Sequence, residues 1–376
     1  MSKPTNNNTG IELLRIIAIL LLIIYHVSLI GTEGDYPPYL NAILSITKMG
    51  WVGTDLFLAI AGFFCVNSIF KYKSQNLNYF DYLKNRVLRI VPSYYLFLIV
   101  YLIFGIELIN LLGNSFALND GFLISLITFT SNISFSNGMW SGVALEGMFS
   151  IALLVQLFIF FGFILFYIKN IKLLLIIFLC FELLAITLRI QFGVDHFWRS
   201  YFFTLTRIDA FLMGLTLGIL YSNFKAKEHF SSNAVIIFCS ALILLTLTVY
   251  LTQGLYFKNP LMLHLAYPVI ALFAASLINL SYRYEINTLW LKKLSKLGKI
   301  AYPIYLLKLP VIYLVYSALL LFFAEINPVV FKGLFFISAI FACFLTAGGW
   351  HYLIKSLFIQ SKKFVAQANF KRLIFK

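Results

Sequence analysis

Long apolar runs are the feature that most constrains what this chain can fold into. A helix needs about 20 apolar residues to cross the hydrocarbon core of a bilayer. Ten runs of that length follow one another: 11–31, 50–70, 88–109, 143–168, 172–192, 200–222, 232–252, 261–281, 298–324 and 329–354. A shorter apolar stretch, 121–135, is rich in Ser, Thr and Asn. We therefore predict an all-α polytopic membrane protein with about ten transmembrane helices and one short re-entrant or interfacial segment.

Composition excludes the other broad classes of protein. The 376 residues are 61% hydrophobic and 11% charged, whereas a soluble domain is about half apolar and a quarter charged. Such a chain can neither cover itself with polar side chains nor remain disordered. Because no polar stretch could form a second domain, we expect one transmembrane domain at 11–355. An N-terminal cytoplasmic tail at 1–10 and a basic cytoplasmic tail at 356–376 would flank it.

The formal net charge of +15 raises the question of where the positive side chains lie. In a soluble protein this excess would suggest a nucleic-acid partner, but in a membrane protein it sets the orientation. With the N-terminus inside and ten alternating crossings, 21 of the 29 Lys and Arg residues fall in or beside inner segments. This predicts an N-in, C-in protein of the inner or plasma membrane. Anionic lipid accounts for the basic surface, and no nucleic acid is needed.

Two ionisable residues in the first crossing share one helix face. Charges inside a crossing are costly and usually mark function or a buried pair. Arg15 and His26 are eleven residues apart, which is three turns plus about 20° and an axial distance of about 16 Å. Arg15 could instead extend to the inner interface, and His26 could pair with a neighbouring helix. Their shared face favours a role inside the bundle.

Further candidates lie at the ends of the following crossings. Asp55 lies at a depth similar to that of His26, although it could simply be a first-turn carboxylate on a helix dipole. Arg86 and Arg89 form an i, i+3 cationic pair suited to phosphates, or they are ordinary inner-face charge. Glu146 opens the next crossing on the outer side.

A later crossing contains Arg207 and Asp209, followed by Gly214 and Gly218. The spacing of the glycines predicts close helix packing. Arg207 and Asp209 could be a structural ion pair.

Taken in order, these segments resemble the acyltransferase-3 family of membrane proteins over residues 11 to 355. The segments that carry the resemblance are Arg15-x10-His26, Gly53-Thr54-Asp55-Leu56-Phe57, Arg86-x2-Arg89 with Pro92, Glu146-x2-Phe149, Arg207-x-Asp209 through Gly218, and Leu297-Gly298 through Leu307. Four positions depart from the family pattern. They are Trp140, one residue further from Glu146 than usual; Ser150 for Tyr; Lys308 where His is common; and Lys355 where Glu is common.

The resemblance implies transfer of an acyl group, most simply acetyl, from cytoplasmic acetyl-CoA to a hydroxyl of a surface or lipid-linked polysaccharide. A hydroxyl needs a general base at neutral pH, and the ordinary pKa of histidine near 6.5 suits that role. We expect His26 to be the base or a transient acyl carrier, with Asp55 or Glu146 orienting it. The donor phosphates would bind three arginines, Arg15, Arg86 and Arg89, although Arg15 could instead stabilise the developing oxyanion. No metal is expected, since no cysteine has a CxxC partner.

Two other functions remain open from the sequence. Intramembrane His, Arg and Asp residues also serve ion coupling in transporters, so a glycan exporter of similar build is an alternative. Against it, we find no inverted repeat of broken helices. A membrane sensor or scaffold that kept the fold and lost activity is a third possibility, which the Lys308 and Lys355 departures leave open.

Overall fold

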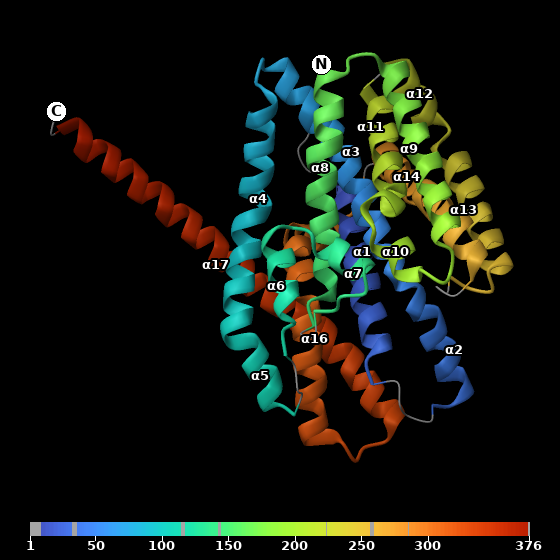
Figure 1. Ribbon diagram of the computed structural model, residues 1–376, viewed down its shortest axis with the longest axis vertical. Coiled ribbons are helices and arrows are strands. Elements are labelled where there is room, and N and C mark those ends of the chain that lie inside the picture. The colour runs from blue at the N-terminus through green and yellow to red at the C-terminus, as the bar shows by residue number, and fades with distance from the viewer. Residues whose placement is uncertain are drawn as a thin grey trace.

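The computed structural model describes residues 9–31, 36–113, 117–141, 144–222, 224–255, 259–284 and 286–374, and all regular structure in these ranges is helical. The longer helices are α1 (Thr9–Leu29), α3 (Gly53–Ser74), α4 (Tyr79–Val100), α8 (Phe149–Tyr167), α9 (Ile171–Phe192), α11 (Asp209–Ser222), α13 (Ala234–Leu251), α14 (Tyr267–Arg283), α16 (Ala301–Phe323) and α17 (Pro328–Ile374). They pack as a bundle (Figure 1), which confirms the predicted all-α class.

Within the described ranges, nine helical segments are long and apolar enough to cross a membrane. The remaining predicted crossing, 200–222, the sixth in chain order, is not one continuous helix. It is divided into α10 (Phe197–Phe202), the 3₁₀ turn η4 (Thr204–Arg207) and the shorter α11. The break occurs at Phe203, whose backbone is extended at φ −66° and ψ 139°. Hydropathy could not reveal this break because an apolar residue scores the same in either conformation.

The short apolar stretch 121–135 forms two small helices, α6 (Asp120–Ile127) and α7 (Ser131–Ser136). Backbone carbonyls at their junction are bound by side chains of longer helices. Tyr94 of α4 donates to the Leu126 carbonyl at 2.9 Å, and Gln156 of α8 donates to the Phe129 carbonyl at 2.8 Å. The structure therefore confirms a segment too short to cross, held against the bundle.

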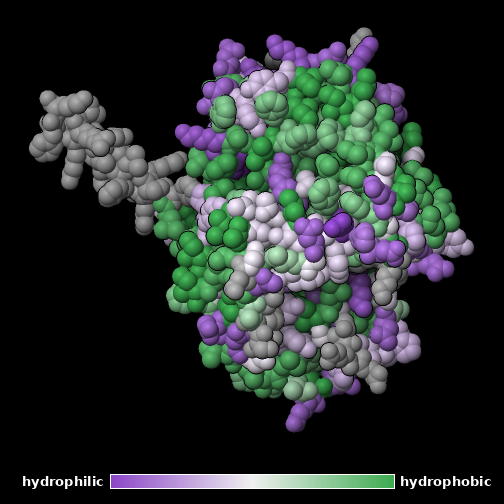
Figure 2. Space-filling view, in the orientation of Figure 1, coloured by the Kyte–Doolittle hydropathy of each residue, from purple (hydrophilic) through white to green (hydrophobic). Residues whose placement is uncertain are grey.

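The connections alternate between the two ends of the bundle. In Figure 1 the N-terminal end of α1, the α3–α4 turn and the α8–α9 connection lie at the upper end, and the α16–α17 turn lies at the lower end. Figure 2 shows hydrophilic residues at the upper end with a broad hydrophobic zone beneath them. This arrangement agrees with the predicted alternation. That the upper end faces the cytoplasm remains a prediction from the positive-inside rule.

Both predicted tails fall near the limits of the described chain. Residues 1–8, most of the predicted tail 1–10, lie outside the described ranges. The predicted tail 356–376 continues α17 as far as Ile374, and this last part of the helix extends away from the bundle (Figure 1). The domain boundary at 355 therefore falls inside one continuous helix.

Glycines allow the central helices to meet backbone to backbone. A Cβ at Gly214 of α11 would lie 2.0 Å from the Ala59 carbonyl of α3, and one at Gly62 would lie 2.2 Å from the Phe211 carbonyl. At the start of α3, a Cβ at Gly53 would lie 2.4 Å from the Ala18 carbonyl of α1. The structure thus confirms the close packing that the glycine spacing predicts. This close packing holds together the parts of α1, α3 and α11 that carry ionisable side chains.

We expect Gly214→Val to unfold the bundle or to lower its melting temperature sharply. The new side chain would overlap backbone, which cannot move aside as a side chain would, so the destabilisation should exceed the 1–3 kcal/mol typical of overpacking. Thermal unfolding in detergent measures the effect. Gly348→Val in α17 is the matched control, since a Cβ there meets nothing within 4 Å. Equal melting of the two variants would contradict this packing.

Candidate functional site

The C-terminal part of α1 presents His26 in one defined tautomer. Its Nδ1 lies 2.6 Å from the Leu22 carbonyl, and its ring makes an edge contact with Tyr25 at 4.9 Å between centroids. Because a carbonyl oxygen only accepts, Nδ1 carries the hydrogen and Nε2 keeps the lone pair. The neutral His26 ring can therefore accept a proton at Nε2.

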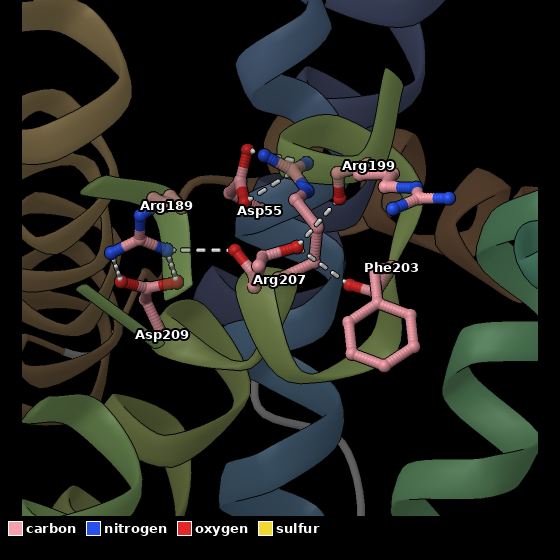
Figure 3. A network of polar contacts seen from close by, with 7 residues as sticks. Asp55, Arg189, Arg199, Phe203, Arg207 and Asp209 are labelled. Atoms are coloured by element: carbon pink, nitrogen blue, oxygen red, sulfur yellow. Dashed lines mark hydrogen bonds and ion pairs between the residues drawn. The ribbon is translucent and has the colours of Figure 1, made fainter. Parts of the chain in front are cut away.

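Asp55 at the start of α3 pairs with Arg207. The two side chains are buried and lie 3.3 Å apart. Three aromatic rings surround the Arg207 guanidinium, with centroids 5.5, 4.9 and 4.6 Å away, and they belong to Trp51, Tyr201 and Tyr267. This pair connects the broken segment before α11 to α3 (Figure 3).

A second buried ion pair lies beside the first. Arg189 of α9 donates two parallel hydrogen bonds of 2.7 Å to the Asp209 carboxylate. It also donates to the Thr206 carbonyl at 2.7 Å (Figure 3). The suggested pairing of Arg207 with Asp209 is therefore wrong: each takes a partner from another element. The physical reason is their spacing, because residues two apart do not face each other on a helix. Arg189 was missed, although a charge inside the apolar run 172–192 was a signal for it.

Glu146 opens the helical segment that continues as α8, as predicted. It lies in the 3₁₀ turn η3 (Glu146–Met148) and accepts a hydrogen bond of 2.7 Å from the Ser141 hydroxyl. Among the described residues, neither Glu146 nor Asp55 is hydrogen-bonded to His26, whose Nδ1 contacts the Leu22 carbonyl instead. An orienting role for either carboxylate stays a prediction.

Lys308 of α16 reaches the turn at Glu146. It is 1% exposed, and a Cβ at Gly147 would lie 3.0 Å from its Nζ. Its helix α16 also packs against α1, which carries His26. The site around His26 is thus built from α1, η3 and α16. The sequence marked Lys308 only as a departure from the family pattern and did not place it in the site.

The N-terminal end of α1 carries Arg15, which is partly buried. Its guanidinium pairs with Glu12 at 2.6 Å and lies 5.3 Å from the ring centroid of Phe64 in α3. Glu12 in turn packs against Gly298 in the 3₁₀ turn η6 (Lys296–Ile300), where a Cβ would meet the carboxylate at 2.4 Å. Arg15 is therefore fixed where α1, α3 and η6 meet.

The other two predicted donor-binding arginines lie on α4 near Arg15. Arg86 donates to the Phe64 carbonyl at 3.1 Å and to the Ser68 hydroxyl at 2.8 Å. Its guanidinium is therefore largely engaged in hydrogen bonds to α3. Arg89 is exposed, and among the described residues it makes no hydrogen bond or ion pair. Arg15 and Arg86 both contact Phe64 of α3, and Arg89 follows Arg86 by three residues on α4. The structure therefore brings the three predicted cations into one electrostatic cluster, in which Arg89 has the free guanidinium.

Comparison with known proteins decides the family. The acyltransferase-3 family model, described as an acyltransferase domain, matches residues 8–348. The chain belongs to the acyltransferase-3 family. It is a multi-pass membrane acyltransferase, in agreement with the resemblance in the sequence. No curated protein and no solved structure matches this acyltransferase significantly.

Proposed function

We propose that this acyltransferase moves an acyl group, most simply acetyl, from cytoplasmic acyl-CoA to a hydroxyl of a surface or lipid-linked polysaccharide in the plasma membrane. The observation that carries the proposal is the tautomer of His26, whose Nε2 is free to take a proton. On the same helix, about 16 Å away, Arg15 belongs to a cluster of cations suited to phosphates. The proposal thus assigns donor recognition and proton transfer to two depths along one helix.

Acetyl-CoA suits this separation because a long flexible arm joins its phosphates to its thioester. With the phosphates at the arginine cluster, the arm would extend along α1 toward His26. The acceptor hydroxyl would approach from the other end of the bundle. His26 Nε2 would take the hydroxyl proton as the oxygen attacks the thioester carbon, which makes an ester and releases CoA as its thiol.

Arg89 is the side chain that we expect to contribute most directly to donor affinity. A hydrogen bond to a charged group is worth about 1.5–3 kcal/mol, so Arg89→Gln should raise the KM for acetyl-CoA about 10-fold or more and change kcat little. Steady-state kinetics with purified protein measures both constants. Lys84→Gln removes an exposed positive charge from the same helix and is the matched control. An unchanged KM in Arg89→Gln would contradict this placement of the donor.

The function itself is tested with purified protein reconstituted in lipid vesicles. Acetyl-CoA labelled in its acetyl group is added outside with polysaccharide or lipid-linked glycan from the same cells. We expect label in the glycan, and mass spectrometry of the surface glycan from cells with and without the gene should give the matching added mass. Glycan that crosses the membrane without gaining an acyl group would instead indicate an exporter.

A further inference from the structure

The Lys308 side chain is buried and has no acidic partner among the described residues. Among the described residues, no carboxylate oxygen lies within 4.0 Å of its Nζ, whereas the buried Arg189 and Arg207 each have one. Its Nζ donates only to the Tyr305 carbonyl of its own helix, at 3.2 Å, and lies 3.9 Å from the centroid of the Tyr305 ring. A buried ammonium in this state is unfavourable unless something else brings negative charge to it.

A comparison with the other buried lysine makes the difference clear. Lys332 of α17 is as buried as Lys308, yet it donates to the Val27 and Ile30 carbonyls at 2.9 and 2.6 Å. These carbonyls belong to the end of α1, where a helix leaves acceptors unpaired. Lys332 therefore has a structural explanation. Lys308 donates to a carbonyl in the middle of its own helix, so its burial has no comparable structural explanation.

The surroundings of Lys308 indicate where the negative charge would arise. Its Nζ lies against Gly147 of η3, where a methyl group would crowd it. Because Gly147 has no side chain, the Lys308 amine directly contacts this turn. Lys308 also lies on a helix, α16, that packs against α1, the helix that carries the proposed base His26.

We infer that Lys308 is a further catalytic residue, whose ammonium stabilises the oxyanion formed on the acyl carbonyl oxygen during transfer. This inference rests on the proposed function. The acceptor oxygen bonds to the acyl carbon while its proton passes to His26 Nε2, and the carbonyl oxygen takes the negative charge beside Lys308. The carbon–sulfur bond then breaks, its electron pair goes to sulfur, and CoA leaves as the thiol with the proton from His26. A cation already in place for the charged state lowers the barrier without rearrangement.

The test compares Lys308→Met with Lys308→Arg, using acetyl-CoA and succinyl-CoA as alternative donors. Lys308→Met should lower kcat about 10²–10³-fold, the usual loss for an oxyanion donor, with the donor KM unchanged. The loss should be equal for both donors, and Lys308→Arg should restore part of it. Because no carboxylate loses its partner, Lys308→Met should melt at or above the wild-type temperature. Lys332→Met, the matched control, should melt lower and keep its kcat.

Three outcomes would overturn the inference. A kcat of Lys308→Met within threefold of wild type would remove any catalytic role. A loss confined to succinyl-CoA would mean that the ammonium pairs with a carboxylate of the acyl group. A wild-type protein that transfers neither acyl group would overturn the proposed function itself, and Lys308 would then have no oxyanion to stabilise. If Lys308→Met does not fold, Lys308→Gln carries the same measurements.

Discussion

His26→Ala is expected to abolish detectable glycan acylation while the protein remains folded in the membrane. A positioned general base contributes about 10²–10⁴-fold to the rate, and a hydroxyl at neutral pH is a poor nucleophile without one. The only side-chain hydrogen bond of His26 found among the described residues is to the Leu22 carbonyl. That carbonyl is already the acceptor of a main-chain helix bond, so the substitution should lower the melting temperature little. Transfer of labelled acetyl to glycan measures the loss.

His351→Ala is the matched control for this experiment because His351 is exposed on α17. It should acylate glycan at the wild-type rate. The pH profile gives a second readout: the wild-type rate should fall as the pH drops below the pKa of the base, since a protonated imidazole cannot accept a proton. The residual rate of His26→Ala should lack that fall. Near-normal product from His26→Ala would exclude His26 as both base and acyl carrier.

The spans were predictable because hydropathy records a property that each apolar run has by itself. A run such as 172–192 must be buried in lipid or protein wherever its neighbours lie, and it forms α9 (Ile171–Phe192). The break at Phe203 depends on tertiary contacts instead. Arg207 must reach Asp55 in one direction while Asp209 reaches Arg189 in another. Which partners these two neighbouring residues take depends on which helices meet, and no local pattern in the sequence records it.

The same distinction applies to the site. The sequence gives the residue types of Arg15 and His26, and their depths follow from their positions along one helix. Their partners do not, because these depend on which helices meet. Asp55 was expected near His26 from its similar depth, but depth does not specify direction, and the structure pairs it with Arg207. Lys308 lies inside an apolar run and departs from the family pattern, and the proposal made for it treats that departure as the signal.

Arg189→Met is expected to destabilise the fold by about 3–5 kcal/mol, the usual effect of removing one partner of a buried ion pair. It would leave the Asp209 carboxylate without its two hydrogen bonds. The free energy of unfolding in mixed detergent micelles measures the loss.

The double variant Arg189→Met/Asp209→Leu separates the cost of an unpaired charge from the value of the pair. An apolar replacement of both partners removes both charges of the pair, so most of the stability should return. Activity should not return with it, because Arg189 also binds the Thr206 carbonyl and so helps to hold the turn before α11 that carries Arg207. A double variant as unstable as Arg189→Met would show that the pair itself stabilises the fold. A double variant with full activity would show that Arg207 reaches Asp55 without help from Arg189.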